Sequence, residues 1–463
     1  MNIARELVDY CASIEFEMLP NDVIEAAKVQ ILDCLGVGLA GVKARGIAEL
    51  VHINSAWGGR EESAVIGHNL SLPAPNAAQI NATIMHARDF DDGHPAALVH
   101  PGAISVATAL ALAEQAGSLS GKDCLAAVAM GTDLICRLGM AVQSDQPKSV
   151  TGWHFTALFG FPASSAVAGR ILRLSPEKMN GALAIAYHQC AGSAQAMIDG
   201  ALTKRLGVGF AVRGGITAAL LAAEGVSGAS GWLEGEAGLY RQYFGSPCNG
   251  NALLSDLGLN FEGANVGTKR YPCCGIVHPF IDATLQLIRG ADFDVEEIEE
   301  IRVWHGEGTR FLVEPRKTKQ QPVSIVDAQF SVPWGVAAAL TAGKVTLEHF
   351  TDEGIRNEKI RDLSCKVTAQ LDESMTRLDS LEAGRVELRL AGGRKLTTTC
   401  ENMMNNGGGR MPFDECVEKF YECAAFSGMG LSDMKLTKAV ERIKNFENLS
   451  DVSELVRLLQ PEQ

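Results

Sequence analysis

The sequence predicts a mainly α-helical protein in which both ends of the chain form one large all-helical domain and a smaller α+β domain is inserted between them. Apolar residues recur at helical spacing through about the first 260 residues. Alternation typical of strands begins only after Lys269, and helical spacing returns after Gly409. We therefore place the helical domain at 1–267 and 405–463, and the α+β domain at 268–404.

The first part of the chain contains a series of helical segments. Residues 3–16 form the first predicted helix, and the second, 20–41, opens after Pro20-Asn21-Asp22 and runs out at Gly41. Further helices are predicted at 78–84, 103–117, 121–142 and 175–190. Several are rich in alanine and leucine on all sides, and such helices are usually surrounded by other helices. We expect a layered helical domain.

The inserted part combines strands with helices. Residues 297–305 and 365–371 alternate apolar and polar positions as strands do, and 385–400 is predicted to be a β-hairpin that turns at Ala391-Gly392-Gly393-Arg394. Helices are expected at 278–290 and 328–342, and the chain becomes helical again up to Leu459. The glycine-rich run 405–409 is not a phosphate loop, because no Lys-Ser or Lys-Thr follows it.

Length and charge limit the class of partner. The chain has 463 residues, of which 46% are hydrophobic, so it can bury a large core. Its formal net charge of −14 argues against nucleic acid, which binds to basic surfaces. A small anionic partner remains compatible with this charge, provided that a few cations converge locally.

The cysteines and the N-terminus indicate a cytoplasmic protein. Twelve cysteines are scattered through apolar stretches without a Cys-x-x-Cys pattern, as expected for small buried residues in a reducing compartment. The first residues show no basic stretch followed by an apolar one, so no signal peptide is predicted. Because no uninterrupted apolar run reaches the roughly 18 residues that a membrane span needs, we expect no membrane association.

One polar loop concentrates reactive side chains. Residues 86–100 hold three histidines, three aspartates and one arginine, and Gly93, Pro95 and Pro101 make the segment a loop. Burying such charges costs several kcal/mol each unless they are paired, so a solvated surface or a polar pocket must hold them. Polar loops on a rigid scaffold commonly carry catalytic groups.

Four other short segments could supply chemistry. His154 follows Gly152-Trp153 and precedes an apolar helix, while 203–207 and 269–275 each place two adjacent cations near glycine. The fourth segment, 327–330, reads Asp-Ala-Gln-Phe. Lysine and arginine near a domain boundary suit a polycarboxylate, because they can clamp carboxylates while a cleft closes over them.

Each signal also has a simpler interpretation. A lone histidine on an apolar helix, such as His154 or His188, can be a hydrogen-bonded structural residue. The adjacent Lys204 and Arg205 can be an ordinary solvated pair, and Cys273 and Cys274 can be packing residues. The histidines and aspartates of the loop could bind zinc, iron or manganese, but no helical His-x-x-x-His pattern is present, and we expect no metal.

The same motifs resemble those of the MmgE/PrpD family. The resemblance rests on His-Ala-Arg-Asp-Phe-Asp-Asp-Gly-His-Pro at 86–95 with His100-Pro101 after it, on Lys-Arg-Tyr-Pro-Cys-Cys-Gly at 269–275 with His278, and on 327–330, and it runs nearly end to end. The family contains 2-methylcitrate dehydratases, cis-aconitate decarboxylases and iminodisuccinate epimerases. The resemblance therefore implies cofactor-free chemistry on small di- and tricarboxylates, and a homodimer in which the α+β domain acts as a lid.

The resemblance also assigns residues. It predicts five catalytic residues: Asp89, His100, His154, Lys204 and Lys269. Six further polar residues of these segments are expected to bind the substrate: Arg88, Asp92, His94, Arg205, Arg270 and Gln329. Two positions depart from the decarboxylases, because Gly93 replaces a threonine and Phe330 a tyrosine. A lost hydroxyl partner costs about 1–3 kcal/mol, which argues against cis-aconitate as the substrate.

The shared chemistry makes or breaks a bond next to a carboxylate and develops enolate charge there. Lys204, Lys269 and Arg205 would stabilise that charge, whereas His100 and His154 would act as acid or base because histidine titrates near neutrality. Asp89 is expected to stay ionised and to orient a partner. We predict a hydro-lyase on a methylcitrate-like acid. The alternatives are an epimerase of an imino- or aminodicarboxylate, a cis-aconitate decarboxylase, a metal-dependent hydrolase, or a binding protein without turnover.

Overall fold

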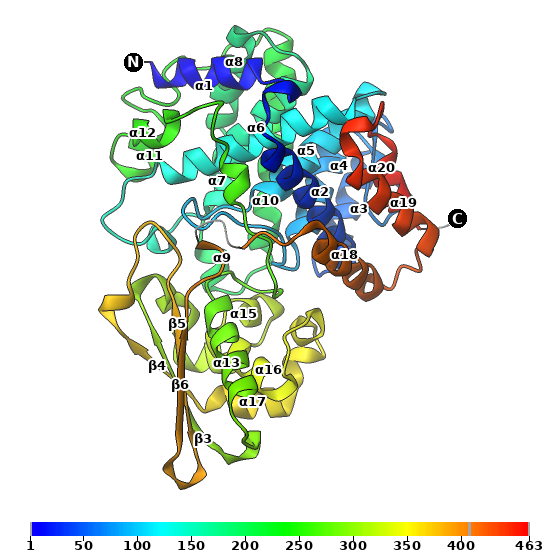
Figure 1. Cartoon of the computed structure of the whole chain (residues 1–463). Coiled ribbons are helices and arrows are strands. Elements are labelled where there is room, and N and C mark those ends of the chain that lie inside the picture. Colours follow the sequence, from blue (N-terminus) through cyan, green and yellow to red (C-terminus); the bar gives the residue numbers. More distant parts are fainter. Residues whose placement is uncertain (1, 406–408, 462–463) are drawn as a thin grey trace.

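The protein is mainly α-helical, as predicted. The computed structural model describes residues 2–405 and 409–461. Figure 1 shows a helical body that contains both the N- and C-terminal ends, and below it a sheet flanked by the helices α13, α15, α16 and α17. The predicted order of helices, then mixed elements, then helices is therefore observed.

The helices of the first part begin where the sequence provides caps. The side chain of Asn2 accepts a hydrogen bond from the backbone of Arg5, and Ser120 and Ser175 cap two later helices in the same way. The first eight helices are α1 (Ile3–Ser13), α2 (Asn21–Gly41), α3 (Ile47–Trp57), α4 (Ala74–His86), α5 (Pro101–Ala116), α6 (Gly121–Met140), α7 (Phe155–Ile171) and α8 (Pro176–Tyr187). No helix was predicted from the sequence at the position of α3.

Two predictions for this part need correction. A short antiparallel pair, β1 (Ser63–Ala64) with β2 (Ser71–Leu72), interrupts the helices, although only helices were expected there. Helix α4 is longer than predicted, because Pro73 and Pro75 allow it to start at Ala74. The remaining helices before the insertion are α9 (Gln195–Ile198), α10 (Thr203–Ala223), α11 (Leu239–Phe244) and α12 (Gly250–Leu254).

Helix α10 lies at the centre of the helical body. It packs against α4, α7 and α8, and twelve of its residues are buried. Among the described residues it is the one helix that is long and apolar enough to cross a bilayer, a criterion that buried core helices also meet. Its apolar run is interrupted by Lys204, Arg205 and Arg213, so it is not the uninterrupted run of about 18 apolar residues that the sequence was predicted to lack.

The inserted part contains a four-stranded sheet with strand order β4-β3-β5-β6. Its strands are β3 (Ile298–His305), β4 (Val367–Leu371), β5 (Gly384–Leu390) and β6 (Lys395–Cys400). β3 runs parallel to β4 and antiparallel to β5, and β5 and β6 form the predicted hairpin. Gly392 and Gly393 have φ of 82° and 84°, so the turn requires glycine.

Helices complete the inserted part and the C-terminal part. Helix α13 (His278–Gly290) matches its prediction, while the predicted helix 328–342 is split into α15 (Ile325–Gln329) and α16 (Val332–Ala342) at Phe330 and Ser331. The others are α14 (Arg316–Gln320), α17 (Glu358–Cys365), α18 (Phe413–Ser427), α19 (Asp433–Lys444) and α20 (Glu454–Leu458). Of the glycine-rich run 405–409, residues 406–408 lie outside the described residues.

Two hydrophobic clusters fill most of the interior. One joins buried residues from Ala4 to Val266 with residues from Met411 to Leu459. The other lies between Cys273 and Met404. All twelve cysteines are free thiols, most of them buried among these side chains. The exact domain limits at 267/268 and 404/405, the lid role and the homodimer stay predictions.

Candidate active site

The polar loop joins α4 to α5 and is buried. Backbone hydrogen bonds hold it in place, because Gly93 pairs with Gly267 and the amide of His94 donates to the carbonyl of Val99 at 2.9 Å. Asp89 has φ of 52°, a left-handed conformation that few non-glycine residues adopt. Of the two sequence-based possibilities, the polar pocket and not the solvated surface holds this loop.

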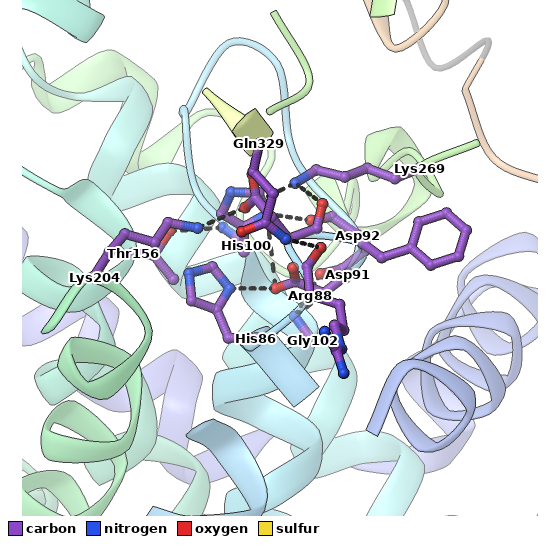
Figure 2. A network of polar contacts seen from close by, with 12 residues as sticks. His86, Arg88, Asp91, Asp92, His100, Gly102, Thr156, Lys204, Lys269 and Gln329 are labelled. Carbon is purple, nitrogen blue, oxygen red and sulfur yellow. Dashed lines mark hydrogen bonds and ion pairs between the residues drawn. The ribbon is translucent and has the colours of Figure 1, made fainter. Parts of the chain in front are cut away.

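Asp89 lies between two lysines from distant segments. One of its carboxylate oxygens is 2.5 Å from Nζ of Lys204 and 3.2 Å from Nζ of Lys269. Lys204 comes from the first turn of α10, and Lys269 from the segment that enters the inserted part, and Figure 2 shows the two side chains converging. Burial alone would raise the pKa of Asp89, but the two ammonium groups outweigh it and hold that pKa well below its usual value. Asp89 is therefore ionised.

Lys269 is fully buried and stays protonated. It donates a second hydrogen bond, of 2.9 Å, to the backbone carbonyl of Asp89. Burial by itself would lower the pKa of Lys269, but the carboxylates of Asp89 and Asp91 outweigh it and raise that pKa above the usual value. The other carboxylate oxygen of Asp89 has no hydrogen-bond partner among the described residues, so it can accept a bond from a ligand.

His100 is held in one tautomer by the loop backbone. Its Nδ1 atom lies 2.5 Å from the backbone carbonyl oxygen of Asp92. A carbonyl only accepts hydrogen bonds, so Nδ1 carries the proton and Nε2 of the neutral ring carries the lone pair. Burial, followed by the charge of Lys269, lowers the pKa of His100 to about 3. The expectation that this histidine titrates near neutrality is corrected, since it is a neutral base over the whole physiological range.

Three histidines form one cluster. The ring of His86 lies 5.0 Å from that of His100 and stacks 5.6 Å from that of His154. Nδ1 of His86 is 2.6 Å from the carboxylate of Asp91, as drawn in Figure 2. Burial lowers the pKa of both His86 and His154, and the charge of Lys204 lowers that of His154 further. The cluster is therefore uncharged at neutral pH.

Four of the expected substrate-binding residues make hydrogen bonds within the protein and do not line the pocket. Arg88 donates to the carbonyl of Ala40, Gln329 donates to the carbonyl of Arg88 at 2.6 Å, and Arg205 donates to the carbonyl of Arg45. The carboxyl of Asp92 accepts bonds from Gln30 and from the amide of Gly102, and its burial beside Asp91 raises its pKa to about 8. Arg88, Asp92 and Gln329 therefore hold the loop, and Arg205 holds the connection between α2 and α3.

The two remaining expected substrate-binding residues differ in whether they line the pocket. His94 lines the pocket and lies 3.1 Å from a carboxylate oxygen of Glu262. Arg270 lies 3.6 Å from Glu415, with 38% of its side chain exposed, and does not line the pocket. All five expected catalytic residues, in contrast, line one pocket, which has about 700 Å³ of space not filled by atoms, part of it open to solvent.

Sequence reasoning missed several contributors. Lys419 of α18 donates to the carbonyls of Phe90 and Lys269 and pairs with Asp33 at 2.6 Å, so it ties the loop to the Lys269 segment. Three residues of the pocket wall lie on remote segments that carry no polar motif: Phe311, Leu381 and Met404. One indication in the sequence that Lys419 is buried and paired is its place on the apolar side of a predicted helix.

One group of residues has the composition of a metal site. Ligand atoms of His86, Asp91 and His100 lie within 4.8 Å of one another. Nδ1 of His86 is hydrogen-bonded to Asp91, and Nδ1 of His100 donates to the carbonyl of Asp92. A metal-binding histidine commonly donates its other ring N–H to a carboxylate or carbonyl, so a metal here would bind to Nε2 of each ring, and the arrangement fits a metal site as well as a hydrogen-bonded histidine network.

Comparison with known proteins identifies the chain. Models of the MmgE/PrpD N-terminal and C-terminal domains match residues 5–249 and 271–440. A cis-aconitate decarboxylase of Aspergillus terreus is 26% identical over 477 residues, covering 99% of this chain and 96% of that protein. The cis-aconitate decarboxylase of Homo sapiens is 28% identical over 458 residues, covering 95% and 91%. The chain is therefore a lyase and belongs to the MmgE/PrpD family.

Proposed function

We propose that this lyase acts on a small di- or tricarboxylate and begins by removing a proton from a carbon next to a carboxylate, as in the dehydration of a methylcitrate-like acid. The observation that carries the proposal is the tautomer of His100, whose Nδ1 donates to the carbonyl of Asp92. The ring nitrogen left for the pocket is an unprotonated Nε2, which can accept a proton from carbon.

The lysines would provide the complementary electrostatics. A substrate carboxylate placed beside Lys204 and Lys269 would transfer negative charge to its oxygens as His100 takes the α-proton, and the two buried ammonium groups would stabilise that enolate. The electron pair then forms the double bond as the β-hydroxyl leaves with a proton from an ammonium group. Asp89 would keep both lysines aligned and protonated.

Decarboxylation is the second candidate, because the relatives named above are cis-aconitate decarboxylases. In that reaction a carboxylate leaves as carbon dioxide and the resulting carbanion needs a proton donor. The neutral His100 presents a lone pair and not a proton, so a lysine would have to supply it. The two candidates thus differ at His100, which accepts a proton in the dehydration and transfers none in the decarboxylation.

Proton NMR in D2O tests the proposal directly. The purified protein is incubated with 2-methylcitrate, citrate, cis-aconitate and iminodisuccinate, and a His100→Asn variant serves as the comparison. We expect loss of water with formation of an alkene in the wild type, and a loss of rate of about 10²- to 10⁴-fold in the variant. Release of carbon dioxide would favour decarboxylation. Deuterium entering an α-carbon without elimination would contradict the proposed elimination and favour the epimerisation considered from the sequence.

A further inference from the structure

Both parts of the chain contribute apolar residues to the lining of the pocket, those of the helical part being Pro95, Leu98, Val99, Trp153, Phe155 and Met197. The helical part contributes most of the polar groups, among them Asp89, His100, His154 and Lys204. The segment 273–404 contributes one glycine and six side chains without formal charge: Cys274, Ile276, Phe311, Phe330, Leu381 and Met404. A site built to surround a ligand with carboxylates on every side would not be lined in this way, because an unpaired carboxylate against hydrocarbon is strongly disfavoured.

The charge at the polar end is small. Lys204 and Lys269 provide two positive charges, which are offset by the carboxylate of Asp89, in contact with both, and by the buried carboxylate of Asp91 nearby. The neighbouring histidines are neutral, because burial lowers their pKa values. The site therefore has no surplus of positive charge for several buried carboxylates, so the parts of the ligand beyond the carboxylate at the lysines must lie nearer to solvent or be apolar.

A second hollow, with apolar and polar residues in its lining, adjoins the pocket. Five residues line both spaces: Pro95, Leu98, Ser149, Ile276 and Leu381. The second space has about 330 Å³ not filled by atoms, part of it open to solvent. Its two cations do not point to an anion site, and the carboxylate of Glu382 in the same lining is bonded to Gly308 and Thr309. Lys148 is bonded to the carbonyls of Ala96 and Met140, and Arg377 is exposed and bonded to the carbonyl of Ser374.

We propose that the substrate is a polycarboxylate with a hydrocarbon substituent larger than methyl, bound with one carboxylate at Lys204 and Lys269 and the substituent against Ile276, Phe311, Leu381 and Met404. The carboxylate end of this inference rests on the proposed function. The hydrocarbon end rests on the apolar lining and the adjoining second hollow alone. Each methylene transferred from water to this surface strengthens binding about fourfold.

The test uses citrate and its 2-methyl, 2-ethyl, 2-propyl and 2-butyl derivatives with the full-length protein. Turnover is followed by NMR and binding by calorimetry. We expect kcat/KM and affinity to rise about fourfold for each added methylene through propyl. If citrate is turned over but kcat/KM stays level or falls along the series, this inference is overturned while the lyase proposal stands. If no acid is turned over, calorimetry tests the apolar site by itself. An affinity that rises with the length of the substituent supports this site, whereas a level affinity or no binding overturns it.

Two matched variants test where the substituent binds. Leu381→Asn places an amide of similar size in the shared lining of the two spaces, and we expect it to abolish the dependence on chain length. Leu363→Asn is the control, because Leu363 belongs to the same hydrophobic cluster and is similarly buried, 6% against 8%, but lines neither space. The same loss of dependence in both variants would overturn the assignment of the substituent to this surface.

Discussion

The Nδ1 atom of His100 donates a hydrogen bond to the backbone carbonyl of Asp92, eight residues earlier in the same loop. The carboxyl group of that aspartate is in turn fixed by Gln30 of α2 and by the first turn of α5. The protonation state of one ring nitrogen is therefore set by two helices that do not touch the pocket. This relationship determines what His100 can do, because it fixes the lone pair on Nε2.

The buried state of His100 predicts a dependence of stability on pH. Its pKa in the folded protein is about 3, whereas the exposed side chain in the unfolded chain titrates near 6.5. Between these values only the unfolded state binds the proton, so the free energy of unfolding falls as the pH is lowered from 6.5 toward 3, by about 1.4 kcal/mol per pH unit. Urea titrations of wild type and His100→Asn should differ by this slope. The exposed His52→Asn serves as the control, and an equal slope in wild type and His100→Asn would contradict the prediction.

The carboxylate of Asp89 is predicted to be essential for both stability and activity. In Asp89→Asn the ammonium groups of Lys204 and Lys269 would lose their shared counter-charge while remaining buried. We expect the free energy of unfolding to fall by about 3–5 kcal/mol and kcat/KM by about 10²-fold. Urea unfolding and the NMR assay measure the two effects.

Asp9→Asn is the matched control for Asp89→Asn. Asp9 pairs with Arg5 on the exposed face of α1, where 48% of its side chain is accessible. Its loss should change the free energy of unfolding by less than about 0.5 kcal/mol. If both substitutions lower the free energy of unfolding equally, the predicted importance of burying Asp89 between the two lysines is wrong.

The two missing hydroxyl groups are predicted to restrict the choice of substrate. Both Gly93 and Phe330 line the pocket, and the ring of Phe330 lies 5.2 Å from Nζ of Lys204. A Cβ atom at Gly93 would lie 2.9 Å from the terminal methyl of Met404, a flexible group that can move aside. The double variant Gly93→Thr, Phe330→Tyr should therefore fold and raise kcat/KM for cis-aconitate about 5- to 150-fold. Phe261→Tyr, outside the pocket, is the control, and no gain in the double variant would refute the prediction.

Removal of divalent metal ions is predicted to leave activity unchanged. The proposed proton transfers use only His100 and the two lysines, and none of these steps needs a metal at the His86, Asp91 and His100 group. Dialysis against EDTA, followed by the NMR assay and by measurement of metal content, checks this expectation. Loss of activity that zinc or manganese restores would instead support the metal-dependent hydrolase considered from the sequence.

Periodicity predicted most elements of the fold, and the departures have local causes. The helix 278–290 and the hairpin 385–400 follow from spacing and turn residues, which act within a few positions of the chain. The β1/β2 pair was missed because strands of two residues have no detectable alternation. The predicted helix 328–342 divides because Ser331 caps α16 instead of continuing α15.

The candidate site, like the fold, was predicted only in part. Motifs in the sequence selected Asp89, His100, His154, Lys204 and Lys269, which all line one pocket. They could not show that Arg88, Asp92, Arg205 and Gln329 do not line it, because side-chain direction depends on packing against α2, α18 and the segment around Arg45.

The sequence by itself thus determined the mainly helical class and the family, and it predicted the strands after Lys269 and the candidate residues for the chemistry, since residue types and short spacings carry that information. Only the tertiary structure decided the protonation of the histidines, the pairing of Asp89 with two lysines more than 100 residues away, and the apolar surface supplied by Phe311, Leu381 and Met404. Burial and the field of neighbouring charges set these properties, and both arise only when distant segments meet.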